Sequence, residues 1–128
     1  MTELAISARV AAEEVRVLFE AGLYSGACSR AYYAMFNAAR AMLLSRGYPL
    51  EAVKTHKSVL RLFSLEFVQR GTFKPELARA LRKAPDARHV ADYEGGVLRE
   101  DAAEVMAALG AFMNDAEAFL GNAMRGQP

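Results

Sequence analysis

The chain has 128 residues, enough to bury a core and most simply arranged as a single domain over 1–128. Its 16 basic and 15 acidic residues give a net charge of +1, which excludes a domain that attracts nucleic acid by overall charge. Cys28 is the single cysteine, so an internal disulfide framework is excluded. The sequence carries no signal-peptide pattern and no apolar run of membrane-spanning length, and we expect a cytoplasmic protein.

The first half of the sequence predicts two helices joined by a short link. Residues 2–21 carry apolar side chains at three- and four-residue steps, and Gly22 ends the pattern. Residues 24–46 carry two adjacent apolar stripes, one through Met35 and one through Phe36. A helix that is apolar on two sides must be surrounded by other helices, so we expect 24–46 to be the central helix.

The second half predicts further helices and no strands. Thr55 can cap a third helix that runs to Gly71, and Pro75 suits the first turn of a fourth. Pro85 interrupts that helix, which leaves a short helical segment before a last helix over about 100–123. The sequence lacks alternating β-branched runs and hairpin signals. The expected fold is all-α, an up-and-down bundle of about four long helices plus a short one.

Three groups of polar residues are candidates for a functional site. Arg30, Tyr33 and Asn37 lie at helical steps on the central helix. They predict either a buried hydrogen-bond network that fixes helix register or the lining of a cleft, and we expect them to form a polar seam facing the third and fourth helices.

The second group is Lys54, His56 and Lys57, at the start of the third helix. Cations are disfavoured there by the helix dipole, and a bound anion such as phosphate would relieve the repulsion. A solvated basic turn is the plainer interpretation. A nucleotide or small anion held in a cleft lined by Arg30, Tyr33 and Lys54 is a further hypothesis.

The third group surrounds Pro85 and consists of Arg82, Arg88, His89, Asp92 and Tyr93. A histidine beside arginines could support acid–base chemistry on a phosphodiester, with arginine stabilising the developing charge. The alternative is an Arg–Asp pair with a tyrosine packed at a helix end. The sequence has no phosphate-binding glycine loop and no metal-binding histidine or cysteine motif, so we expect neither a cofactor nor a metal site.

Four segments together resemble the small stand-alone HEPN-domain proteins of bacteria and archaea. They are YSGACSRAYYAMFNAARAMLLSRG, KTHKSVLRLF, EFVQRG and ARHVADY, followed by the apolar last helix. The resemblance implies an all-helical, dimeric protein paired with a minimal nucleotidyltransferase in a toxin–antitoxin module. In active members it further implies a metal-independent ribonuclease with an Arg, four to six residues and then a His, and in some members a tyrosine two positions later that the partner modifies.

The motif does not carry over cleanly to this sequence. Arg88 matches the motif arginine by position, but the place of the histidine is held by Tyr93, Glu94 or Gly95. Arg82 and His89 have six residues between them, as the motif allows, although Pro85 lies within that interval. Two hypotheses follow. One is a dimeric module that binds a nucleotidyltransferase or RNA without cleaving it, and the other is a ribonuclease that uses Arg82 or Arg88 with His89.

Overall fold

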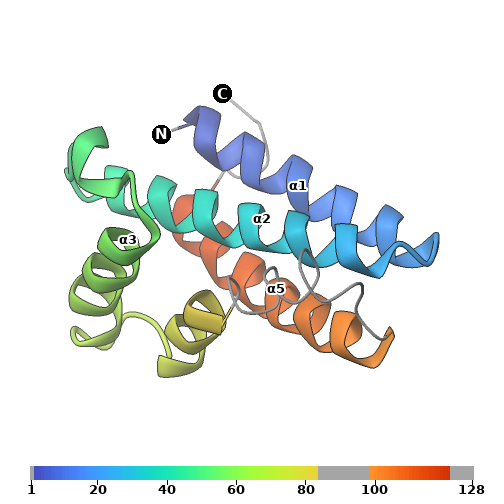
Figure 1. The fold of residues 1–128 in the computed structure, drawn as a ribbon. Helices are drawn as coiled ribbons and strands as arrows, with labels where there is room; N and C mark the ends of the chain where they lie inside the picture. Colours follow the sequence, from blue (N-terminus) through green and yellow to red (C-terminus); the bar gives the residue numbers. More distant parts are fainter. Residues whose placement is uncertain (1, 84–98, 122–128) are drawn as a thin grey trace.

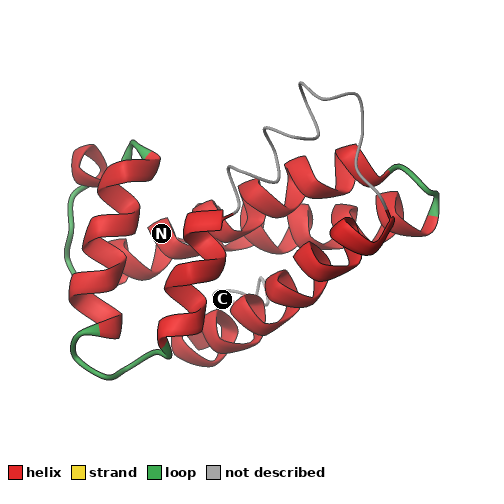
Figure 2. Cartoon of the chain, turned by 60° about the horizontal axis from the view of Figure 1, so that its bottom comes forward, coloured by secondary structure: helices red, strands yellow, loops and turns green. Residues whose placement is uncertain are grey.

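The computed structural model describes residues 2–83 and 99–121, and these form a bundle of helices with no strand (Figures 1 and 2). The long helices are α1 (Thr2–Glu20), α2 (Tyr24–Ser45) and α5 (Arg99–Leu120). The shorter ones are α3 (His56–Phe63) and a helical stretch over residues 75–83. The predicted all-α bundle is confirmed.

The central position of α2 is also confirmed. It packs against α1, α3 and α5, and both predicted stripes are buried, including Met35 and Phe36. In Figure 1, α1 and α2 run antiparallel, side by side over most of their length, with α5 against the other side of α2. Gly22 allows the tight link between α1 and α2, because its φ of 78° lies in the left-handed region that glycine adopts without steric cost.

Alanines fill the inside of the α1–α2 pair. Seven alanines of the two helices are 0–1% exposed, and such small side chains allow two helix backbones to approach closely. They are Ala5, Ala8 and Ala11 on α1 and Ala31, Ala34, Ala38 and Ala41 on α2.

Large aromatic side chains fill the opposite part of the core. Phe63 lies at its centre, with ring centroids 5.1 Å from Phe67, 6.1 Å from Phe73 and 5.6 Å from Phe112. Phe63, Phe67 and Phe112 are at most 1% exposed, so this cluster joins α3 and α5 through fully buried contacts.

The third helix departs from the prediction of one regular helix up to Gly71. After Phe63 the chain makes a π-helical turn over Ser64–Val68, in which the N–H of Gln69 donates to the carbonyl of Ser64. A π turn takes one residue more than an α turn. Phe63 and Phe67 both stay in the core across it. The preceding connector also contains an unpredicted 3₁₀ turn, Leu50–Val53, which buries Val53.

The remaining boundaries agree with the prediction where the structure describes them. Thr55 caps α3, since its hydroxyl accepts a hydrogen bond from the N–H of Ser58 at 3.1 Å. Helix α5 begins one residue before the predicted start. The predicted break at Pro85 lies outside the described residues.

Cys28 is buried, as its place on the apolar stripe predicts. It packs with Ala102, Phe19, Tyr24 and Val105, and burial raises the pKa of its thiol. A buried thiol with a raised pKa carries little thiolate at neutral pH, so Cys28 is a packing residue and a poor nucleophile.

Candidate functional site

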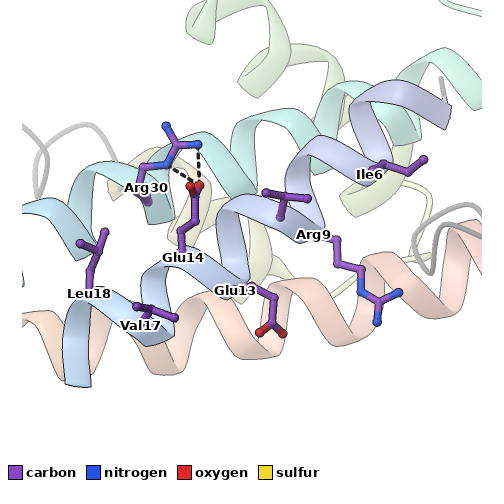
Figure 3. A pocket seen from close by; sticks show the side chains of 8 residues that line it. Ile6, Arg9, Glu13, Glu14, Val17, Leu18 and Arg30 are labelled. Carbon is purple, nitrogen blue, oxygen red and sulfur yellow. Dashed lines mark hydrogen bonds and ion pairs between the residues drawn. The ribbon is translucent and has the colours of Figure 1, made fainter. Parts of the chain in front are cut away.

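The polar seam of α2 faces α1, and the prediction that it faces the third and fourth helices was wrong. Arg30 holds one oxygen of Glu14 through Nε at 3.0 Å and Nη2 at 2.8 Å, as Figure 3 shows. Asn37 Nδ2 donates to the hydroxyl of Ser7 at 3.3 Å. Ser7 and Glu14 are seven residues apart on α1, as are Arg30 and Asn37 on α2, so two antiparallel helices bring both pairs together.

Tyr33 lies beside the same seam but is 41% exposed. The guanidinium of Arg30 stands 5.1 Å from the centre of the Tyr33 ring, within the range of a cation–π contact. Arg30 also lines a groove with residues of α1, without Tyr33 or Lys54 among its lining residues. This groove therefore differs from the cleft over Arg30, Tyr33 and Lys54 that the sequence suggests.

A second sector of α2 carries a cluster of rings with a cation. Tyr32 and Phe36 stack with centroids 5.8 Å apart and planes 9° apart. The ring of His56 lies 5.9 Å from Tyr32 and 6.2 Å from Phe36, and the guanidinium carbon of Arg40 lies 5.4 Å from the centre of Phe36. We call Tyr32, Phe36, Arg40 and His56 the aromatic–cation cluster.

Arg40 connects this cluster to the seam that faces α1. Its Nη1 donates to Asn37 Oδ1 at 3.4 Å, and Asn37 in turn contacts Ser7. Its Nε is buried and forms no hydrogen bond with the described residues. A buried guanidinium N–H without an acceptor costs free energy.

Two exposed lysines flank His56, because Lys54 precedes the capping Thr55 and Lys57 follows in the first turn of α3. Together with the N–H groups at the start of α3, they concentrate positive charge next to the aromatic–cation cluster. The structure thus places His56 in one cluster with Arg40, and Lys54 and Lys57 are the close chain neighbours of His56. Tyr33 contacts both Tyr32 and Arg30, so it joins this cluster to the Arg30–Glu14 pair.

Of the third predicted group, the structure describes only Arg82. It is exposed near the end of the 75–83 helix, which Leu77, Ala78 and Leu81 anchor in the core. Arg88, His89, Asp92 and Tyr93 lie outside the described residues, so their predicted roles stay predictions.

Sequence reasoning assigned Tyr32 and Phe36 to the core and did not connect Arg40 with His56. The available signal was the four-residue spacing of Tyr32, Phe36 and Arg40, which places two rings and a cation on one helix face. Residues 2–83 and 99–121 hold no group of three acidic, histidine or cysteine side chains that could bind a metal ion. None of the helices in these ranges is long and apolar enough to cross a membrane.

Several known proteins are similar to this chain in sequence. It is 37% identical over 89 residues to the "Putative toxin MJ0605" of Methanocaldococcus jannaschii, a match that covers 70% of this chain and 64% of that protein. It is 35% identical over 123 residues to a UPF0332 protein of Archaeoglobus fulgidus, covering 94% and 91% of the two chains. It is 30% identical over 105 residues to the "Putative toxin MJ0142" of M. jannaschii, covering 80% and 69%.

The first of these relatives is longer than the matched region, so the chain spans a little under two thirds of it. The family model described as HEPN domain matches residues 2–119, nearly the whole sequence. That match includes all four segments from which the resemblance was drawn. The chain therefore belongs to the HEPN domain family.

Proposed function

We propose that this chain is the HEPN component of a toxin–antitoxin type module, a cytoplasmic homodimer that associates with RNA and with a minimal nucleotidyltransferase partner. The names of two relatives, "Putative toxin MJ0605" and "Putative toxin MJ0142", support the toxin–antitoxin setting. The observation that carries the RNA part is the aromatic–cation cluster with its flanking lysines.

The chemistry of that surface suits a nucleic acid strand. Lys54 and Lys57 are exposed and supply charge for phosphates, and Arg40 adds a further cation beside the rings. Exposed Tyr33 lies edge-on to Tyr32, with ring centroids 5.7 Å apart, and provides a ring on which a base can stack. A net charge of +1 means that binding depends on this local patch, and we expect it to be weak and sensitive to salt.

Replacing both Lys54 and Lys57 by alanine should weaken binding to single-stranded RNA and reduce its salt dependence. Each phosphate contact to a single strand contributes about 0.7 to the slope of log affinity against log salt, so the double variant should lose about 1.4. Fluorescence anisotropy with a labelled RNA across a salt series measures both quantities.

Lys74→Ala is the matched control, because Lys74 is an exposed lysine that lines a different depression beside Phe73 and Phe119. It should leave the salt slope unchanged. Equal losses in the control and the double variant would contradict a localised RNA surface. Failure of the wild type to bind RNA at low salt would contradict the RNA association as a whole.

The partner part of the proposal has its own test. Co-expression with the product of the adjacent gene, followed by affinity capture of this chain, should yield a stoichiometric complex if that gene encodes a nucleotidyltransferase. The absence of a complex with such a product, at concentrations where both proteins are folded, would contradict the partnership.

A second candidate function is a metal-independent ribonuclease that uses Arg82 or Arg88 with His89. Arg82 favours it, because this arginine is exposed near the end of an anchored helix, a few residues before the other two. A positioned general acid–base contributes about 10²–10⁴-fold to a rate. Cleavage of RNA in EDTA should therefore fall by that factor in His89→Ala, while circular dichroism shows an intact helical fold.

The two possible motif arginines make the ribonuclease test more specific. If Arg82 pairs with His89, Arg82→Ala should lose as much activity as His89→Ala, and Arg88→Ala should lose less. The reverse order would favour Arg88. A folded wild-type protein that leaves mixed RNA intact in EDTA would rule out the ribonuclease and favour the binding module.

A further inference from the structure

Arg40 is the cation of the aromatic–cation cluster that is held in place before any ligand binds. Its guanidinium carbon lies 5.4 Å from the centre of the Phe36 ring, its Nε is buried, and its Nη1 donates to Asn37 Oδ1 at 3.4 Å. Lys54 and Lys57, by contrast, are exposed. A long cationic side chain loses rotamer freedom when it is immobilised, so an arginine that is already held loses less on binding.

The helical spacing of α2 supplies two of these contacts. Phe36 and Asn37 precede Arg40 by four and three residues, so both lie on the side of the helix that the Arg40 side chain covers. Side chains of a helix point back toward its N-terminus, which brings the guanidinium over the ring and the amide. Its Nη2 forms no hydrogen bond with residues 2–83 or 99–121, which leaves this nitrogen available to a phosphate oxygen.

The amide of Asn37 is oriented from α1. Its Nδ2 donates to the hydroxyl of Ser7 at 3.3 Å, while its Oδ1 accepts from Arg40. The two contacts use opposite ends of one amide, so the hydrogen bond to Ser7 fixes which end faces the guanidinium. A helix that contributes no residue to the aromatic–cation cluster therefore influences where the cation of that cluster lies.

A role for Asn37 in stability alone is the plainer interpretation, and its surroundings argue against it. Ser7 is exposed, so water competes for its hydroxyl and the hydrogen bond contributes little to the free energy of unfolding. Packing at this level of α2 comes from Ala34 and Ala41, which lie one turn before and after Asn37 and are 0% exposed. What the amide adds is its contact with Arg40.

We propose that Asn37 is a positioning residue for RNA binding. Oriented by Ser7, it holds the guanidinium of Arg40 over Phe36, where Nη2 contacts a phosphate of the bound strand. The inference rests on the RNA surface of the proposed function and extends the support of that surface to α1. Asn37 itself acts without touching the RNA.

The salt dependence of RNA binding separates positioning from stability. Arg40→Gln should lose one phosphate contact, which lowers the magnitude of the slope of log affinity against log salt by about 0.7 for a single strand. Asn37→Leu exchanges one uncharged side chain for another and keeps a good helix former, yet it should lower the slope by the same amount. A residue that served stability alone would change the melting temperature and leave the slope at its wild-type value.

The double variant, Asn37→Leu with Arg40→Gln, tests whether Asn37 acts through Arg40. If it does, the slope of the double variant should fall by about 0.7 and not by about 1.4, because one phosphate contact can be lost only once. At fixed salt the affinity should fall about tenfold in each single variant, the usual contribution of a hydrogen bond to a charged group, and no further in the double variant. Fluorescence anisotropy with labelled single-stranded RNA across a salt series measures the slope and the affinity.

Asn114→Leu is the matched control, because Asn114 is an exposed asparagine of α5 that lines a different depression with Met113 and Glu117. The same change of side chain at this position should leave the slope unchanged. If Asn37→Leu does not fold, Asn37→Ser takes its place, since it removes the amide without adding volume and has the same expected slope.

The outcomes distinguish this inference from the RNA surface on which it rests. An unchanged slope in folded Asn37→Leu, or a double variant that loses twice as much as either single one, would overturn the positioning role and leave the assay of Lys54 and Lys57 unaffected. An unchanged slope in Arg40→Gln would overturn it as well, because Arg40 would then contact no phosphate. A wild-type protein that binds no RNA at low salt would overturn both the surface and the positioning role.

Discussion

Phe63→Ala should lower the free energy of unfolding by about 3–5 kcal/mol, the usual cost of removing a large buried aromatic side chain. Phe63 is 0% exposed and its ring neighbours come from the turn after α3, from Phe73 and from α5, so one substitution opens a cavity where three segments meet. Urea denaturation measures the free energy of unfolding, and the midpoint temperature of thermal unfolding should fall by roughly 10–20 °C.

Leu65→Ala is the control for this loss. It lies two residues further on, within the π turn, and its side chain is 45% exposed. Exposed truncations change stability by about 0.5 kcal/mol or less. If Phe63→Ala unfolded at the same temperature as Leu65→Ala, the aromatic cluster would not be part of the cooperative core.

Leu81→Ala should cost about 2–5 kcal/mol, the second large effect that the structure implies. Leu81 is 0% exposed and anchors the 75–83 helix, together with Leu77 and Ala78. Loss of this anchor should lower global stability and also loosen the 75–83 helix that carries Arg82. Denaturant unfolding measures the global part, and hydrogen exchange over residues 75–83 measures the local part.

Arg82→Ala separates stability from chemistry at the neighbouring position. Arg82 is exposed, so its truncation should change the free energy of unfolding by about 0.5 kcal/mol or less. Any loss of RNA cleavage in this variant could then be assigned to the missing guanidinium. If Arg82→Ala were as unstable as Leu81→Ala, the exposed position of the arginine would be wrong and its activity data would not bear on the motif.

Much of the fold could be predicted because helical periodicity depends on local spacing. The central role of α2 followed from its two apolar stripes, and the cap at Thr55 followed from the residue type before a helical run. The π turn at Ser64–Val68 could not be predicted in this way. One extra residue in a turn changes hardly any propensity, so local spacing does not indicate it.

The candidate site was harder to predict, because its contacts join residues that are distant in the sequence. The types and spacing of Arg30 and Asn37 indicated a polar seam, but spacing on one helix does not tell which neighbour it meets. The partners are Glu14 and Ser7 of α1, whose seven-residue interval matches that of Arg30 and Asn37 on α2. His56 was singled out for its place at a helix start, whereas its ring contacts with Tyr32 and Phe36 depend on the angle between α2 and α3.

The alanines between α1 and α2 have a consequence for how this sequence can change. Ala8 and Ala38 are fully buried, so every replacement except glycine adds volume inside the core, and glycine weakens the helix. Around Phe63, by contrast, several large side chains can exchange volume with one another. A saturation library selected for folding should therefore accept repacked combinations in the aromatic half and reject nearly all changes at the alanines, so that the α1–α2 contact tolerates fewer substitutions than the aromatic part of the core.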